Sequence, residues 1–319
     1  MQNLISLKQN FLLYPFGLYN NSILCYFNSL LQTLLSCTSI TEYLLRNEEE
    51  LKNNKFLILY IKLIKKYINS ENHSNYLVDN TNILLFNEFL TIIKSKKINF
   101  GYDQEDSGEL LLLLLDIINN KYINDLFLHR YKCDIYCKQC KKLTNIQSDI
   151  SSFFEININD LNNKFLNYNV DKHLSNLNKY LRNNYSELEN YICSNCKYNN
   201  MNIKIHRLTL IPTILVINLN KYILKSNYQY PIELIFINKL SEYCYKYKLI
   251  STINHSGSQN FGHYITKTIR KNHEYKHCTD KEFDIYLLND TSYQKDNFKS
   301  DSNSYLLFYH YIETCDYFD

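Results

Sequence analysis

Cys25-Tyr26-Phe27-Asn28-Ser29-Leu30-Leu31-Gln32 is the stretch that decides the fold. Within residues 24–35, apolar side chains recur at positions 27, 30, 31, 34 and 35, which is the spacing of one helix face. The pattern predicts a buried helix that begins near Cys25. Unpaired backbone N–H groups and the dipole at a helix start stabilise a thiolate, so we expect a lowered pKa for Cys25. A lone cysteine is more often a packed core thiol, and spacing alone leaves both interpretations open.

A nucleophilic cysteine needs a base and a group that orients the base, and the C-terminal part of the chain offers both. Gly262-His263-Tyr264 lies between two strand-like stretches, and Asn289-Asp290 follows the mostly aliphatic residues 285–288. A folded sheet can bring these residues to one surface. Cysteine, histidine and an orienting amide or carboxylate form a complete set for nucleophilic catalysis.

Two Cys-x-x-Cys pairs predict a metal site. They are Cys137 with Cys140 and Cys193 with Cys196, and 53 positions separate the pairs. Four thiolates form a closed tetrahedral site for a structural zinc ion, with no open position for an activated water. The surrounding residues 131–202 are poor in apolar side chains, so this segment needs such a staple. Four unrelated buried thiols are the alternative, and Cys133 could compete as a ligand.

Composition excludes several classes of protein. The chain has 319 residues, of which 45% are hydrophobic, so it can bury a large core and is not disordered as a whole. A net charge of +3 lacks the basic surplus of a nucleic-acid binder. The sequence shows no export signal and no membrane-spanning run. We therefore expect a protein of the cytoplasm or nucleus, monomeric, in contact with neither nucleic acid nor membrane.

The order of elements predicts an α+β fold. Residues 56–64 and 106–119 have helical patterns, and Asp106 and Glu109 lie one turn apart at the start of the second pattern, where acids suit the helix dipole. Strand patterns follow at residues 213–222, 245–252 and 304–309. Helices first and strands later are typical of α+β proteins.

Several stretches occur in the same order as the conserved boxes of one family, and together the chain resembles the ubiquitin-specific proteases. The stretch from Cys25, with Gly17-Leu18-Tyr19-Asn20 before it, resembles the cysteine box of that family. The residues around Gly262-His263-Tyr264 resemble its histidine box. The other matching stretches are Gln104-Glu105-Asp106-Ser107-Gly108-Glu109-Leu110, residues 208–222, Tyr230-Pro231-Ile232-Glu233-Leu234, Tyr247-Lys248-Leu249, Asn254-His255-Ser256-Gly257, Asn289-Asp290 and residues 305–309.

The resemblance implies a papain-like catalytic domain over residues 1–319. It consists of a helical thumb (14–128), zinc-bearing fingers (129–206) and a palm built on an antiparallel sheet (207–319). It also implies roles for individual residues. Cys25 matches the nucleophile, His263 the general base and acid, Asn289 the group that orients the imidazole, Asp290 its neighbour and possible substitute, and Asn20 the amide that donates to the oxyanion.

Substrate contacts also follow from the resemblance. Asp106 and Glu109 match residues that bind the basic C-terminal tail of ubiquitin, with Gln104 beside them, and two carboxylates on one helix face can pair with arginines. A simple preference for acids in a first helical turn is the alternative. Tyr222 and Tyr264 are candidates to line a channel that admits Gly-Gly, although aromatic strand residues usually pack in a core.

The implied activity is that of a thiol-dependent hydrolase that removes ubiquitin from proteins. One departure bears on it: where the family has Leu-Gly-Asn-Thr before the cysteine, this chain has Asn21-Ser22-Ile23-Leu24. Ser22 replaces a glycine beside the oxyanion site, which could strain the turn that aims Asn20. The alternatives are a ubiquitin-binding scaffold without turnover and a protease for another ubiquitin-like modifier. We assign His255, which precedes the second glycine of the box, to structure or to the cleft wall.

Overall fold

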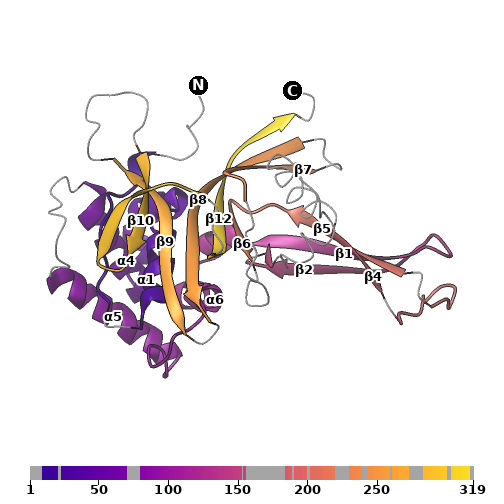
Figure 1. Cartoon of the computed structure of the whole chain (residues 1–319), viewed down its shortest axis with the longest axis horizontal. Coiled ribbons are helices and arrows are strands. Elements are labelled where there is room, and N and C mark those ends of the chain that lie inside the picture. Colours follow the sequence, from indigo (N-terminus) through magenta and orange to yellow (C-terminus); the bar gives the residue numbers. More distant parts are fainter. Residues whose placement is uncertain are drawn as a thin grey trace.

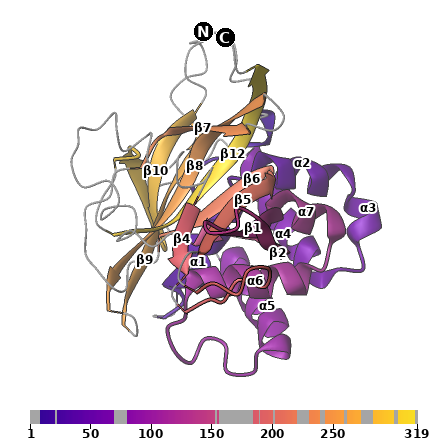
Figure 2. The same cartoon turned by 90° about the vertical axis from the view of Figure 1, so that its right-hand side faces the viewer.

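Helices occupy the N-terminal part of the chain and strands the rest (Figures 1 and 2). The computed structural model describes residues 9–20, 23–69, 80–152, 154–155, 184–188, 190–199, 202–219, 230–238, 243–258, 261–272, 283–299 and 303–316. The described elements form a helical thumb, a large palm sheet beside it and a narrow sheet that projects away from both (Figure 1). Among the described residues, each helix is too short or too polar to span a bilayer.

The thumb contains the predicted helices. Its elements are η1 (Gln9–Phe11), α1 (Cys25–Leu34), α2 (Thr38–Arg46), α3 (Glu48–Leu51), α4 (Lys55–Ile68), α5 (Asn80–Lys96), α6 (Ser107–Ile118) and α7 (Lys121–Phe127). All residues of α1 are buried, as its apolar stripe predicts. Side chains of Asn54, Asp106 and Asn120 cap α4, α6 and α7 by accepting from backbone N–H groups.

The palm is an eight-stranded sheet in the order β11-β10-β9-β8-β12-β6-β3, with β7 paired to β8. Its strands are β3 (Phe154–Glu155), β6 (Ile214–Asn218), β7 (Glu233–Asn238), β8 (Tyr243–Gly257), β9 (Gly262–Lys271), β10 (Phe283–Asn289), β11 (Ser292–Asp296) and β12 (Ser304–Asp316). The pairs are antiparallel except β3 with β6. The three predicted strands overlap β6, β8 and β12, and residues 220–222 of the first prediction lie outside the described residues.

The projecting sheet has the order β2-β1-β5-β4 and is antiparallel throughout. Its strands are β1 (His129–Cys137), β2 (Leu143–Ser151), β4 (Asn184–Leu188) and β5 (Asn202–Leu210). Cys137 is the last residue of β1 and Cys140 follows it, while Cys193 and Cys196 lie between β4 and β5. The loops after β1 and before β5 are at the outer end of this sheet (Figure 1).

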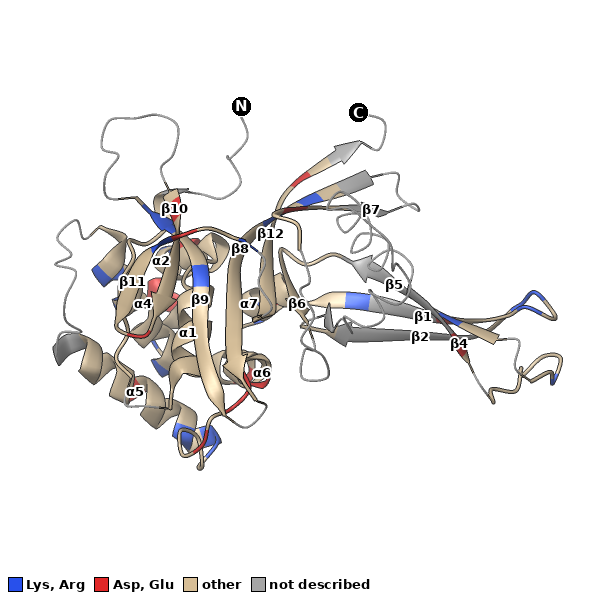
Figure 3. Ribbon diagram, viewed as in Figure 1, with Lys and Arg blue, Asp and Glu red and all other residues tan. Residues whose placement is uncertain are grey.

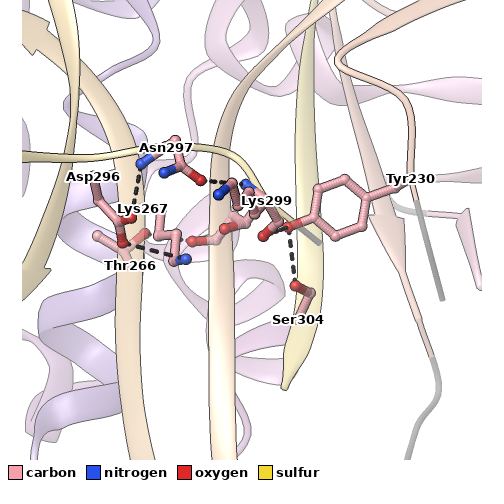
Figure 4. Close-up of polar contacts among 8 residues, drawn as sticks. Tyr230, Thr266, Lys267, Asp296, Asn297, Lys299 and Ser304 are labelled. Atoms are coloured by element: carbon pink, nitrogen blue, oxygen red, sulfur yellow. Dashed lines mark hydrogen bonds and ion pairs between the residues drawn. The ribbon is translucent and has the colours of Figure 1, made fainter. Parts of the chain in front are cut away.

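Polar contacts fasten the segment between β11 and β12 to the palm (Figure 4). Lys267 of β9 forms an ion pair with Asp296 at 3.2 Å. Tyr230 donates its hydroxyl to the Lys299 carbonyl at 3.5 Å and accepts from the Ser304 hydroxyl at 3.0 Å. The ion pair joins β9 to the edge strand β11, and β10, which ends at Asn289, lies between these two strands.

Candidate active site

The site forms where α1 begins, where β9 begins and where β10 ends. The chain before α1 lies directly against the turn after β10, because the Leu18 N–H donates to the Asp290 carbonyl at 2.7 Å. Gly17 is required for this approach, since a Cβ atom there would lie 2.2 Å from the Thr291 carbonyl oxygen. The glycine therefore lets two segments far apart in sequence meet near Cys25.

Cys25 is buried, with a relative exposure of 2%. Its Sγ accepts from the Tyr264 N–H at 3.4 Å and from Gln104 Nε2 at 3.5 Å. Burial raises the pKa of the Cys25 thiol above its ordinary value, the hydrogen bonds from Tyr264 and Gln104 lower it, and the charge of Asp290 raises it further. The predicted lowering of the Cys25 pKa is therefore wrong, because desolvation outweighs the donors around the sulfur.

His263 and Asn289 are neighbours at the edge of the site, as the sequence predicts. His263 Nε2 lies 2.7 Å from Asn289 Oδ1, and both side chains are exposed. The pairing of β9 with β10 brings them together, because the two strands run antiparallel from Phe283 to Leu288. Within the described residues, no hydrogen bond joins Cys25 Sγ to the imidazole of His263.

Asp290 is the centre of a hydrogen-bond network. Its backbone is left-handed, with φ of 47°, and its carboxylate accepts from Asn20 Nδ2 at 2.8 Å and from Asn28 Nδ2 at 2.7 Å. Asn20 Oδ1 accepts from the Leu24 N–H at 3.1 Å, one residue before α1.

Asn28 was missed by the sequence analysis. Its place one turn after Cys25 on the same helix is the signal that could have found it. Asn21 and Ser22 lie outside the described residues.

Gln104 bridges the thumb and the palm across the thiol. Its Oε1 accepts from the Gly262 N–H and its Nε2 donates to the Gly262 carbonyl, both at 2.6 Å. The structure thus places Gln104 against the residue before His263 and against Cys25.

Acidic residues lie at and just before the start of α6 (Figure 3). Asp106 is the N-cap, since its Oδ1 accepts from the N–H groups of Gly108 at 2.7 Å and Glu109 at 3.0 Å, while its Oδ2 accepts from Tyr305 at 2.5 Å. The side chain of Glu109 is exposed. Asp106 therefore has a structural role, and Glu109 is the acid whose side chain lies open to a cationic partner.

The rings of His255 and Tyr264 pack against each other, and the Tyr264 backbone contacts the thiol. Their rings lie 4.3 Å apart, and Tyr264 also packs edge-on against Tyr26 and Tyr305. Tyr264 is only 2% exposed, so its ring belongs to the core here, while its backbone N–H contacts Cys25. Burial lowers the pKa of His255, so this imidazole favours the neutral state. Tyr222 lies outside the described residues.

The four predicted zinc ligands lie together. Their Sγ atoms are all within 4.8 Å of one another, and two pairs, Cys137 with Cys196 and Cys140 with Cys193, are 3.7 Å apart. A tetrahedral zinc ion with Zn–S distances of about 2.3 Å separates its sulfur atoms by about 3.8 Å. The donor set and its spacing therefore fit a zinc ion.

Both cysteine loops have the same backbone turn. The Cys137 N–H donates to the Lys142 carbonyl at 3.0 Å, and the Cys193 N–H donates to the Tyr198 carbonyl at 2.9 Å. In each loop the lysine after the second cysteine is left-handed, with φ of 56° and 58°. The repeated turn aims two thiols from each loop toward one point.

Comparison with known families shows the family to which the chain belongs. The model of the ubiquitin carboxyl-terminal hydrolases matches residues 16–309, which include every residue of the site described above. The chain therefore belongs to the ubiquitin carboxyl-terminal hydrolase family and is a cysteine-type deubiquitinating hydrolase. No curated protein shows significant sequence similarity to it.

Solved structures show the same fold. The SAGA DUB module Ubp8/Sgf11/Sus1/Sgf73 bound to monoubiquitin matches with a TM-score of 0.71 and 20% identity, over 99% of this chain and 72% of that chain. The same module bound to ubiquitin aldehyde matches with a TM-score of 0.70 and 19% identity. A yeast form with a variant Sgf73 matches with a TM-score of 0.68 and 18% identity. Both matches cover 99% of this chain and 72% of that chain. The predicted α+β fold with helices, a four-cysteine cluster and antiparallel sheets is confirmed.

Proposed function

We propose that the chain hydrolyses the isopeptide or peptide bond after the C-terminal glycine of ubiquitin, through Cys25, His263 and Asn289. One observation carries the proposal: His263 Nε2 lies 2.7 Å from Asn289 Oδ1, and the next residue, Tyr264, donates its N–H to Cys25 Sγ at 3.4 Å. The nucleophile thus lies against the strand that presents an oriented imidazole.

The tautomer of His263 follows from its partner. The amide oxygen of Asn289 can only accept, so Nε2 carries the proton and Nδ1 of the neutral ring is free to act as the base. As Sγ attacks the glycine carbonyl, the thiol proton passes to Nδ1, and the leaving lysine amine then takes that proton. Water, deprotonated by His263, attacks the thioester, releases the ubiquitin carboxylate and returns the thiol of Cys25.

Two donors serve the developing oxyanion. The first is the backbone N–H of Cys25 at the start of α1. The second is the Asn20 amide, which gives one of its two Nδ2 hydrogens to Asp290 and is held by that carboxylate. Donors that are already oriented before the reaction stabilise such a transition state by a few kcal/mol.

The remaining contacts concern ubiquitin. Glu109, exposed at the start of α6, is placed to pair with a basic residue of the ubiquitin tail, with Asp106 beside it. A zinc ion on the four cysteines would hold together the outer end of the projecting sheet and take no part in the reaction. The similar structures are assemblies of four proteins, and they give no support to the expectation of a monomer.

A binding protein without turnover is the second candidate, and one observation favours it. The pKa of Cys25 is raised, and its sulfur is not bonded to His263. A neutral thiol in that arrangement is a weak nucleophile. The third candidate is cleavage of another ubiquitin-like modifier. It differs from the first only in which modifier's tail is bound by Asp106 and Glu109.

A covalent probe separates these candidates. Ubiquitin with a thiol-reactive group at its C-terminus is incubated with the protein, and the product is read by intact mass beside a Cys25→Ala control. A shift of one ubiquitin that is lost in the control supports the hydrolase. Binding of ubiquitin without a shift favours the scaffold. Replacing an arginine of the C-terminal tail in the ubiquitin probe then tests which modifier the protein accepts. An unchanged labelling rate would contradict the role of Glu109 in binding that tail.

A further inference from the structure

Buried polar groups join the C-terminal part of α1 to β9. Alternate residues of β9 face α1. At the start of β9, the Tyr264 N–H contacts Cys25. The next three residues of β9 that face α1 have polar side chains. These contact polar side chains of the helix and of the residue after its C-cap. The helix side consists of Gln32, Thr33 and Ser36, and the strand side of Thr266, Thr268 and Arg270. We call these six residues the α1–β9 polar ladder, and all are at most 2% exposed.

The hydroxyl groups form the middle of the ladder. Thr33 Oγ1 lies 2.8 Å from Thr266 Oγ1 and 2.9 Å from Ser251 Oγ of β8. Ser36 Oγ lies 2.5 Å from Thr268 Oγ1. Thr266 of β9 also donates to the Thr252 carbonyl of β8 at 2.9 Å. Together with the two contacts of Thr33, this bond connects α1, β9 and β8.

Arg270 forms the far end of the ladder and is fully buried. Its Nη2 donates to the backbone carbonyl and to the side-chain oxygen of Gln32, both at 2.8 Å, and its Nη1 donates to Ser36 Oγ. In the described part of the chain no carboxylate forms an ion pair with it, and burial lowers its pKa to about 9. A buried guanidinium that binds only neutral oxygens is costly, so its directional hydrogen bonds, rather than net stabilisation, explain its presence.

The ladder has the geometry of a register lock. From Cys25 to Ser36 the helix rises about 16 Å, and from Tyr264 to Arg270 the strand rises about 20 Å. The hydrogen bonds of the ladder lie at the C-terminal part of α1 and at Ser36, while Cys25 contacts the Tyr264 N–H at the first residue of the helix, so α1 contacts β9 at both of its ends. Apolar contacts alone tolerate sliding of a helix along a sheet, because they are not directional. Hydrogen bonds weaken steeply once distance and angle depart from their optimum.

We propose that the α1–β9 polar ladder is a positioning device that fixes α1 along β9 and so holds Cys25 Sγ beside His263. The proposal rests on the proposed function, because it assigns the ladder to the alignment of the Cys25 and His263 pair. None of its six residues touches the reacting atoms. Each acts through the helix or the strand that carries a catalytic residue.

Thr266→Val tests the middle of the ladder, because it removes a hydroxyl and keeps the shape. With a ubiquitin that carries a fluorogenic C-terminal amide, we expect kcat to fall about tenfold while KM stays within about twofold, since misplacement of a reacting group costs rate more than binding. Thr266→Ser keeps the hydroxyl and restores kcat. Thr252→Val is the matched control, because Thr252 is equally buried on the neighbouring strand and its hydroxyl has no hydrogen-bond partner among the described residues. It leaves kcat unchanged.

Arg270→Met tests the far end, and alkylation of Cys25 by iodoacetamide, followed by mass spectrometry of the peptide, gives a readout without ubiquitin. We expect slower alkylation in Arg270→Met and Thr266→Val, with circular dichroism like that of the parent protein. Unchanged kcat and alkylation in folded Thr266→Val would overturn the ladder. If the parent alkylates faster than the variants but releases no fluorophore from ubiquitin, the ladder stands and the proposed function is wrong.

Discussion

Asp290 Oδ2 accepts a hydrogen bond from Asn20 Nδ2 at 2.8 Å, across 270 residues of sequence. The contact links the residue after Asn289 to the amide that we propose as an oxyanion donor. Asn28 holds the other oxygen of the same carboxylate at 2.7 Å. Asp290 therefore orients Asn20 directly, while its neighbour Asn289 contacts His263, so one short turn positions two groups that we propose as parts of the catalytic machinery.

Asp290→Ala should lower kcat by about ten- to a hundredfold with little change in KM, because the Asn20 amide loses the acceptor that aims it. The measurement is steady-state cleavage of a fluorogenic ubiquitin amide. Asp284→Ala is the matched control, since Asp284 lies on β10, just before the turn that holds Asp290, and binds Asn272 and Lys295 instead. An equal loss in both variants would show that the effect is only structural.

The pH dependence of Cys25 should report its surroundings. Burial and the charge of Asp290 raise the pKa of the thiol, and Gln104 lowers it. In a His263→Ala background, the rate of alkylation should therefore rise with pH around a midpoint above that of an ordinary cysteine. Gln104→Ala should move this midpoint up, because a donor to the sulfur is lost. Asp290→Asn should move it down, because a negative charge is lost, and a shift in the opposite direction in either variant would contradict this account.

The sequence predicts which segments carry the site residues better than it predicts the surroundings of those residues. The helix from Cys25, the aliphatic run before Asn289 and the two cysteine pairs follow from local patterns and spacing. For His263 the sequence predicts only a position between two strand-like stretches, whereas the structure places it on β9. The neighbours of Cys25 Sγ do not follow from local patterns, because Gln104 and the Tyr264 N–H approach it only in the folded chain. The same holds for its raised pKa, since local sequence contains the helix dipole and omits the burial that opposes it.

The polar residues of α1 show the same limit. The apolar stripe predicts one buried face, yet Gln32 and Thr33 are buried too. Their burial becomes favourable only because Thr266 and Arg270 of β9 supply hydrogen-bond partners. Periodicity in one segment contains no information about those partners.

Removal of zinc should affect ubiquitin binding before it affects the thiol. Each purified chain should carry one zinc ion, and Cys193→Ser should lose it, because the four sulfur atoms form one closed site. Chelation should then weaken ubiquitin affinity while alkylation of Cys25 keeps its rate, since the cysteine loops belong to the projecting sheet and Cys25 packs against the palm. Active protein without zinc would contradict the site.

Two substitutions of Asp106 should separate its structural role from a role in substrate binding. Asp106→Ala removes the cap of α6 and the acceptor for Tyr305, so the free energy of unfolding should fall by about 1–2 kcal/mol in urea. Asp106→Asn keeps an N-cap side chain and loses the charge, so it should stay close to the parent in stability. A raised KM for ubiquitin in the stable Asn variant would then come from the lost charge. Glu109→Gln provides the comparison, because its side chain is exposed and caps nothing, and a KM that stays unchanged in both variants would exclude these two acids from ubiquitin binding.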